Sequence, residues 1–311
     1  VDAALAMSAV LCVAEPHMTG IGGDCFAMLS IDGSANIKAL NASGKSSENS
    51  SASNLRNKGI KSIKPEMPDA ITIPGAVAGW SLLHKEHGHI PWEEILQPAI
   101  NYARSGIIVH ERVAYDWAKN KEKLLADRDT SKIFLKKNKP FNVTENFKNV
   151  KLSKTLETIA SEGAAGFYNG WVADDMLEKL NRIGGSHTKK DFLNASAEWI
   201  KPISQNYRNI KIHECSPNSQ GIVALIILGI LEQFNVKCMS KNDYIHLFCE
   251  AVKIGYYLRD EYLADANYNK LSVTSFLSKK SMEQYASKID FKRAKVYEKS
   301  LFPDHPDTIY L

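Results

Sequence analysis

The spacing of hydrophobic residues predicts a chain that is mainly helical. Residues 1–14 are almost wholly apolar, and Pro16 ends the helix that they predict because proline lacks an amide hydrogen and clashes with the preceding turn. Apolar residues recur at three-to-four spacing over 243–265, which predicts a long amphipathic helix. Two further helices are predicted at 222–234, where the residues are almost all apolar, and at 272–287.

Strands are predicted where polar and apolar residues alternate. Residues 25–31 and 35–40 flank Asp32 and Gly33, a dipeptide that favours the positive backbone dihedrals of a type I′ hairpin turn. Residues 209–214 alternate as a short strand does. Helices and strands in this order predict an α/β or α+β fold.

The middle of the chain is predicted to be helical after a long surface segment. Residues 41–68 are rich in Ser, Asn and Lys, which predicts little regular structure, and residues 74–201 have a mainly helical pattern. The lysine-rich stretch 119–139 is interleaved with apolar residues and predicts a solvated amphipathic helix rather than a nucleic-acid patch. Residues 191–200 predict another helix. No repeat and no linker divides the chain into independent domains.

Composition excludes several classes of protein. The chain has 311 residues, of which 44% are hydrophobic and 24% charged, as in ordinary globular proteins and unlike collagen-like or disordered chains. Lysine and arginine total 39 against 35 aspartate and glutamate, and a net charge of +4 is too small to indicate nucleic-acid binding. The longest apolar run, 222–231, is about half of what a bilayer span needs. No nucleic-acid partner and no membrane span are therefore expected.

The cysteines and histidines offer candidate chemistry that the spacing does not support. The five cysteines are odd in number and include no CxxC pair, so neither a zinc site nor a disulfide framework is expected, and the apolar neighbours of four of them favour buried thiols. Cys249 lies one turn from His246, but its spacing favours core packing over a thiol nucleophile. His84, His87 and His89 lack the HExxH spacing of a metal site and predict a solvent-exposed turn.

Two phosphate-binding patterns and one hydrolase pattern also fail. Gly44, Lys45 and Ser46 resemble the end of a phosphate-binding loop, but Ala39 stands where its first glycine is required. The glycines at 20–23 lie between a predicted helix and a predicted strand, the reverse of the dinucleotide-binding order. The chain contains no GxSxG nucleophile elbow.

Six segments in the same order resemble the γ-glutamyltransferase (γ-glutamyltranspeptidase) family. They are VDAALAMSAVLCVAEPHMTGIGGDCFAML at 1–29, PGAVAGW at 74–80, ILQPAINYARSG at 95–106, GAAGFYNG at 163–170, SPNSQGIVALIILGILE at 216–232 and EAVKIGYYLRDEYLAD at 250–265. The resemblance implies the α+β, four-layer αββα fold of N-terminal nucleophile hydrolases. This chain would supply the large-subunit part with a helical excursion, and its start inside a helix predicts that residues precede it.

The resemblance also implies an autoprocessing enzyme with a threonine nucleophile. In FPDHPDTIYL, Asp307 precedes Thr308 where family precursors cleave themselves, so residues 1–307 belong to the large subunit and 308–311 begin the small subunit. Thr308 then attacks a small-molecule amide and forms an acyl-enzyme, with its freed α-amino group, of pKa about 8, as general base. The small subunit of the same precursor is the expected partner, and no metal or organic cofactor is implied.

One departure from the family pattern bears on the substrate. Enzymes specific for γ-glutamyl groups carry an arginine after the first hairpin, whose guanidinium pairs bidentately with the substrate α-carboxylate. Ser43 occupies that position here, and Lys45, two residues later, lacks the planar fork of arginine. Ser43 and Lys45 are the candidate substrate-binding residues. The pattern resembles the γ-glutamyltransferase-like branch, whose members include acylases and amidohydrolases such as oxamate amidohydrolase; a non-catalytic relative is a further alternative.

Overall fold

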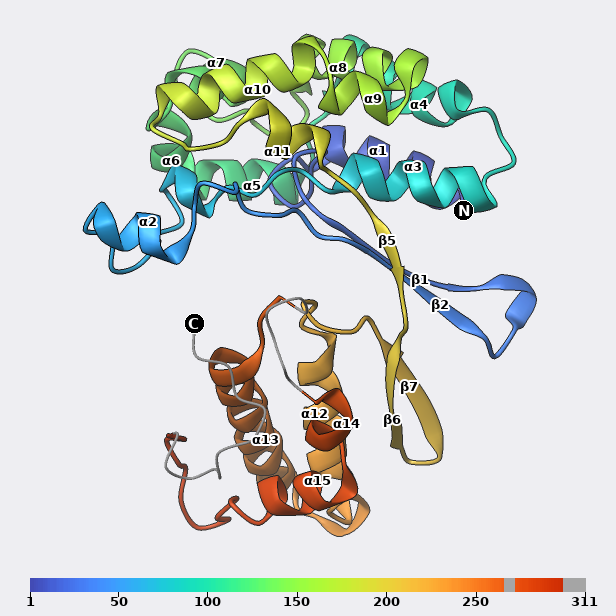
Figure 1. The fold of residues 1–311 in the computed structure, drawn as a ribbon, viewed down its shortest axis with the longest axis vertical. Coiled ribbons are helices and arrows are strands. Elements are labelled where there is room, and N and C mark those ends of the chain that lie inside the picture. The colour runs from blue at the N-terminus through green and yellow to red at the C-terminus, as the bar shows by residue number, and fades with distance from the viewer. Residues whose placement is uncertain (266–271, 299–311) are drawn as a thin grey trace. The chain divides into compact units, whose positions relative to one another are not determined.

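The chain forms two compact units in a computed structural model that describes residues 1–265 and 272–298 (Figure 1). Unit 1 comprises Val1–Cys25 and Ala42–Glu198, and unit 2 comprises Phe26–Asn41 and Trp199–Leu311. The three divisions between the units fall at strands: β1 (Cys25–Ser30), β2 (Ile37–Ala42) and β5 (Glu198–Ile200), which form one sheet in that order. The sequence showed no linker because ordinary strands connect the units.

Unit 1 is helical, with one small sheet. Its elements are α1 (Asp2–Ala14), α2 (Ala52–Asn57), the 3₁₀ turn η2 (Pro68–Ala70), α3 (Ala76–His87), α4 (Trp92–Ser105), α5 (Glu111–Lys119), α6 (Lys121–Leu125), α7 (Arg128–Phe134), α8 (Val150–Glu162), α9 (Ala164–Tyr168), α10 (Trp171–Arg182) and α11 (Lys189–Leu193), with β3 (Ile107–Ile108) antiparallel to β4 (Asn146–Phe147). Helix α4 packs against α1 and α8 through fully buried residues such as Leu96 and Leu156. The first predicted helix is confirmed as α1.

Two helix predictions in unit 1 are wrong in extent. The lysine-rich stretch 119–139 is not one helix, because Asp127 caps a new helix, α7, by accepting hydrogen bonds from the amide and hydroxyl of Thr130. Helix 191–200 is also wrong: α11 ends at Leu193, and β5 begins at Glu198. The segment predicted to have little regular structure, 41–68, contains the short helix α2.

Unit 2 joins a hairpin to a helical core. Strands β6 (Ile203–Tyr207) and β7 (Ile210–Glu214) pair antiparallel, with Tyr207 opposite Ile210, and are followed by α12 (Gly221–Glu232), the 3₁₀ turn η3 (Val236–Cys238), α13 (Lys241–Tyr262), α14 (Val273–Phe276) and α15 (Lys279–Ala286). Figure 1 shows α12 and α13 side by side, and both bury apolar residues in one core. The predicted apolar helix, long helix and strand 209–214 are therefore confirmed, whereas the predicted helix 272–287 is divided in two.

The turn between β1 and β2 differs from the predicted two-residue turn. A 3₁₀ turn, η1 (Ile31–Gly33), follows β1, and β2 begins only at Ile37. Asp32 and Gly33 nevertheless have positive φ angles of 54° and 69°. The dipeptide therefore takes the backbone conformation that its sequence favours, within a longer connection.

The cysteine prediction holds for only part of the set. Cys12 and Cys215 are buried and Cys25 is half-buried, whereas Cys238 and Cys249 are exposed. Core packing of Cys249 is therefore wrong, because it lies beside the exposed Phe248 on a face of α13 that the unit 2 core does not cover.

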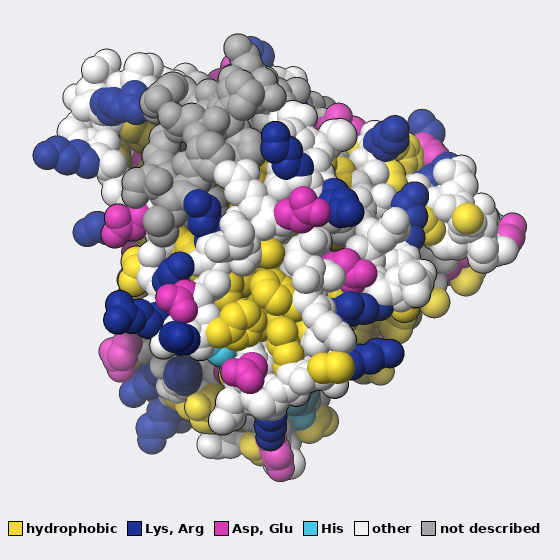
Figure 2. Space-filling view, turned by 90° about the horizontal axis from the view of Figure 1, so that it is seen from below, with side chains coloured by type: hydrophobic (Ala, Val, Ile, Leu, Met, Phe, Trp, Pro, Cys, Tyr) yellow, Lys and Arg dark blue, Asp and Glu magenta, His cyan; other side chains and the backbone are white. Residues whose placement is uncertain are grey.

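The described residues, 1–265 and 272–298, carry charges of both signs on their surface. Acidic and basic side chains are interspersed on the face drawn in Figure 2, which also carries a group of hydrophobic side chains. Over those same residues, no group of three or more His, Cys, Asp or Glu side chains could hold a metal ion. No helix in that part of the chain combines the length and apolar character that crossing a membrane requires.

Candidate functional site

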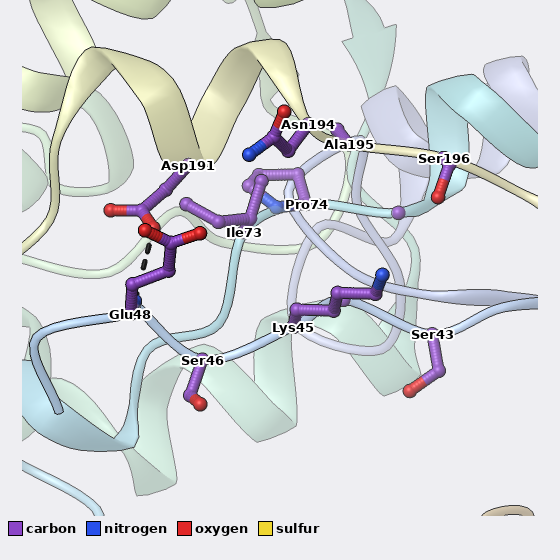
Figure 3. Close-up of a pocket in the computed structure, with 12 residues that line it drawn as sticks. Ser43, Lys45, Ser46, Glu48, Ile73, Pro74, Asp191, Asn194, Ala195 and Ser196 are labelled. Carbon is purple, nitrogen blue, oxygen red and sulfur yellow. Dashed lines mark hydrogen bonds between the residues drawn. The ribbon is translucent and has the colours of Figure 1, made fainter. Parts of the chain in front are cut away.

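Three segments of unit 1 surround a pocket of about 360 Å³ (Figure 3). It is lined by Ser43, Gly44, Lys45, Ser46, Glu48, Ile73, Pro74, Gly75, Asp191, Asn194, Ala195 and Ser196. The structure thus brings both candidate substrate-binding residues, Ser43 and Lys45, to one pocket, together with residues about 150 positions later in the chain.

The first wall of the pocket is fixed by backbone contacts around Gly44. The Gly44 amide donates to the Asp24 carboxylate at 2.8 Å, and the Ile73 amide donates to the Lys45 carbonyl at 2.8 Å. A Cβ atom on Gly44 would lie 1.9 Å from the Ile73 carbonyl oxygen. Only glycine lets these two segments approach so closely, and the contact sets the backbone from which the Lys45 side chain projects.

The second wall is built around Gly75, immediately before α3. The amides of Gly75 and Ala76 both donate to the Gly23 carbonyl at 2.9 Å, which ties this wall to the glycine-rich turn after α1. A Cβ atom on Gly75 would lie 2.0 Å from the Ala42 carbonyl oxygen. The PGAVAG and GIGG motifs therefore serve backbone packing beside the pocket.

Lys45 and Ser43 supply the polar chemistry of one end of the pocket. Figure 3 shows the Lys45 side chain extending along the pocket toward the end where Ser43 and Ser196 lie. The exposed Lys45 ammonium has no hydrogen bond or ion pair with any residue in the described part of the chain. It can therefore bind a negatively charged group of a ligand, and the half-buried Ser43 hydroxyl can add a hydrogen bond.

The other end of the pocket is held by Asp191. Its carboxylate accepts hydrogen bonds from the Thr188 amide at 2.7 Å, the Thr188 hydroxyl at 2.8 Å, the Glu48 amide at 3.0 Å and the Ser47 hydroxyl at 3.2 Å. Burial opposes ionisation of Asp191, but the hydrogen bonds from Glu48, Thr188 and Ser47 outweigh it and lower the pKa. Asp191 is thus an anionic anchor that holds residues 47 and 48 against α11.

Sequence reasoning missed Asp191, Asn194 and Ser196. The spacing of Thr188 and Asp191 is a signal for the first of these, because the two residues form a capping box at the start of α11. Asn194 and Ser196 are exposed and lie in the connection to β5, so the sequence carries no comparable signal for them.

The other candidates lie elsewhere. Asp307 and Thr308, the predicted processing site and nucleophile, lie outside the described residues. His89 is exposed as predicted, but His84 is half-buried at the end of α3, where its Nε2 atom lies 2.8 Å from the Ile90 carbonyl oxygen and its ring packs on Trp92. His87 is also half-buried, so the prediction of a solvent-exposed turn holds for His89 alone, and the contacts of His84 stabilise the turn between α3 and α4.

The chain is similar to known proteins over nearly all of its length. The Gamma-glutamyltranspeptidase family profile matches residues 1–310. The Glutathione hydrolase-like YwrD proenzyme of Bacillus subtilis (strain 168) is 32% identical over 93% of this chain and 55% of its own length, so the chain spans about half of that relative. Gamma-glutamyltranspeptidase of Helicobacter pylori superposes with a TM-score of 0.87 at 28% identity, covering 96% of this chain and 87% of that one.

Cephalosporin acylase of Bacillus halodurans also superposes with a TM-score of 0.87, at 30% identity, covering 93% of this chain and 55% of that one. Both structures have the N-terminal nucleophile hydrolase fold that the resemblance implied. The profile match along the chain and these likenesses together establish that the chain belongs to the γ-glutamyltranspeptidase family.

Proposed function

We propose that the protein is an autoprocessing amidohydrolase or acyltransferase that cleaves γ-glutamyl or related amide bonds. The observation that carries this proposal is the family match, which extends over residues 1–310 and so includes the Asp307–Thr308 junction. The word proenzyme in the name of the Bacillus subtilis relative supports a cleaved precursor. Residues 1–307 would then form the large-subunit part of a four-layer αββα sandwich, with a helical excursion, and residues 308–311 would begin the small subunit.

The proposed chemistry starts with hydrolysis of the Asp307–Thr308 peptide bond, which consumes one water molecule and leaves a new carboxylate on Asp307 and a free α-amino group on Thr308. The freed α-amino group of Thr308 takes the proton from the Thr308 hydroxyl, whose oxygen attacks the amide carbonyl of the substrate. The amine leaves with a proton, and the acyl group remains as an ester on Thr308. Water or an acceptor amine then cleaves the ester, giving hydrolysis or transfer, and no metal or organic cofactor takes part.

The pocket in unit 1 is the proposed binding site for the acyl side of the substrate. The Lys45 ammonium would bind a carboxylate on the acyl group, and the Ser43 hydroxyl would donate a hydrogen bond to it. Lysine provides a point charge in place of the bidentate fork of arginine, so it fixes the position of the carboxylate less strictly.

A second candidate function is acylase or amidohydrolase activity on amides that are not γ-glutamyl. The observation that favours it is Ser43 in the place of the arginine that γ-glutamyl enzymes use. Without that guanidinium, the α-carboxylate of a γ-glutamyl group contributes less binding energy. An acyl group that lacks an α-carboxylate is therefore at a smaller disadvantage. The similarity to a cephalosporin acylase structure is consistent with this alternative.

Mass spectrometry of the full-length precursor tests self-cleavage. We expect a break between Asp307 and Thr308 in the wild type and in Thr308→Ser, which keeps a hydroxyl nucleophile, and an intact chain in Thr308→Ala. An intact wild-type chain would refute the proposed mechanism and favour a non-catalytic relative.

Hydrolysis of p-nitroanilides then separates the two candidate functions. Preference for the γ-glutamyl anilide over the glutaryl and butyryl anilides supports γ-glutamyl specificity, because only the γ-glutamyl group carries both an α-amino and an α-carboxylate group. Equal or faster hydrolysis of the butyryl anilide supports the acylase.

A further inference from the structure

Tyr168 occupies a buried position behind the pocket wall. It is the last residue of α9, it is 6% exposed, and its ring packs edge-on against Phe167. The Tyr168 hydroxyl donates to the Pro74 carbonyl at 2.7 Å and accepts from the Ala78 amide at 3.1 Å. Burial raises the pKa of Tyr168, so the hydroxyl remains protonated and able to donate.

The hydrogen bond from Ala78 satisfies a helix terminus that lacks a capping side chain. Ala78 is the third residue of α3, and its amide is one of the N-terminal donors that no helix carbonyl accepts. A Ser, Thr or Asp at the N-cap position normally accepts from such a donor, but the N-cap here is Gly75. The Tyr168 hydroxyl replaces this cap from another helix.

The pocket explains why the cap comes from elsewhere. A capping side chain at position 75 needs a Cβ atom, which would lie 2.0 Å from the Ala42 carbonyl oxygen. The close approach of the two pocket walls therefore excludes every ordinary capping residue. Tyr168 also fixes Pro74, which lines the pocket opposite Lys45.

We propose that Tyr168 is a positioning residue for the acyl-binding pocket: its hydroxyl joins Pro74 to Ala78 and so holds the Pro74–Gly75 wall at the correct distance from Lys45. This inference rests on the proposed function of that pocket. Tyr168 does not touch the substrate and acts only through the wall. Loss of the hydroxyl widens the range of wall positions and weakens binding of the acyl group, while the chemistry at Thr308 is unaffected.

The test compares Tyr168→Phe with Tyr285→Phe in the full-length protein. Tyr285 is a matched control because it is 1% exposed, lies in unit 2, and its hydroxyl is hydrogen-bonded to Ser281. With glutaryl p-nitroanilide, we expect Tyr168→Phe to raise KM about tenfold with kcat within about twofold, because it removes binding and not chemistry. Tyr285→Phe should leave both KM and kcat unchanged, even if it lowers the melting temperature of the protein as much as Tyr168→Phe does.

Hydrogen exchange gives a second readout that needs no turnover. Peptides covering 73–79 and 43–48 should exchange faster in Tyr168→Phe than in the wild type, and at the wild-type rate in Tyr285→Phe. Unchanged KM, or unchanged exchange in both peptides, would overturn the positioning role. If the wild type neither cleaves itself nor hydrolyses any of the three anilides, the proposed function fails, and exchange alone still decides whether Tyr168 fixes the wall.

Discussion

Asp191 illustrates how one buried carboxylate can organise a surface segment. It is 6% exposed, and its carboxylate oxygens accept hydrogen bonds from the amides of Thr188 and Glu48 and from the hydroxyls of Thr188 and Ser47. Because Ser47 and Glu48 lie more than 140 positions earlier in the chain, this carboxylate holds a Ser- and Asn-rich segment in one conformation. The pocket depends on this anchor.

We expect Asp191→Asn to lower the free energy of unfolding by about 2 kcal/mol at pH 7. The variant replaces hydrogen bonds to a charged acceptor by weaker ones, and its side-chain NH₂ group, itself a donor, faces groups that also donate. The folded-state pKa of Asp191 is lowered, so its stabilisation is complete above the unfolded pKa of about 3.9 and is lost as the pH falls through the folded value. Urea unfolding should therefore show a smaller difference between wild type and variant at pH 3 than at pH 7.

The exposed Asp175 on α10 provides the control for that measurement. Asp175→Asn should change the unfolding free energy by less than about 0.5 kcal/mol. A wild-type advantage over Asp191→Asn that persisted undiminished at pH 3 would contradict the charge-based explanation.

At the scale of single residues, sequence reasoning found the pocket residues that depart from a family pattern and missed those defined by tertiary contacts. Ser43 and Lys45 were identifiable because they stand in and beside the place of an arginine. Asp191 was not, because its partners at 47 and 48 become neighbours only in the folded chain. Tyr168 was missed for the same reason, although it lies within the GAAGFYNG segment at 163–170, because its partners Pro74 and Ala78 are distant in sequence.

At the scale of elements, periodicity predicted helices well where a single apolar face is long. Helix α13 begins within two residues of its predicted start because its apolar spacing continues for several turns. The 191–200 segment failed because a five-residue helix and a three-residue strand are both too short to show a period. Strand β6 was missed, since its Ile203–Tyr207 sequence carries mostly polar residues.

The contact between the two pocket walls yields a prediction about α3. Gly75→Ala should lower the free energy of unfolding by about 2 kcal/mol, because the new methyl group meets a backbone oxygen that cannot rotate away. Gly22→Ala is the matched control: nothing lies within 4 Å of its added Cβ, and we expect a change below about 0.5 kcal/mol. Equal melting temperatures for the two variants, measured by circular dichroism, would show that the walls can separate without cost.

At the scale of the whole molecule, fold and family followed from six ordered segments and not from composition, which allowed almost any globular enzyme. The division into two units could not be predicted, because each unit is discontinuous in sequence and the divisions fall within strands. The whole protein is proposed to carry two separable properties. In this proposal, acyl binding takes place in the pocket of unit 1, and self-cleavage takes place at the junction of residues 307 and 308.

Lys45→Ala in the full-length protein tests that separation. We expect complete cleavage between Asp307 and Thr308, because the Lys45 ammonium has no partner among the described residues and its loss leaves no buried group exposed. We also expect KM for glutaryl p-nitroanilide to rise about tenfold while KM for the butyryl anilide stays constant, since a hydrogen bond between an ammonium and a carboxylate contributes about 1.5 kcal/mol, and about 1.4 kcal/mol corresponds to a tenfold change in affinity. High salt should reduce the wild-type preference for the glutaryl over the butyryl anilide by screening the same charge pair.

Lys85→Ala, on the exposed face of α3, is the control and should leave KM for both anilides unchanged. An unchanged ratio of the two KM values in Lys45→Ala would place carboxylate recognition on other residues, and a loss of cleavage would show that pocket and junction are coupled.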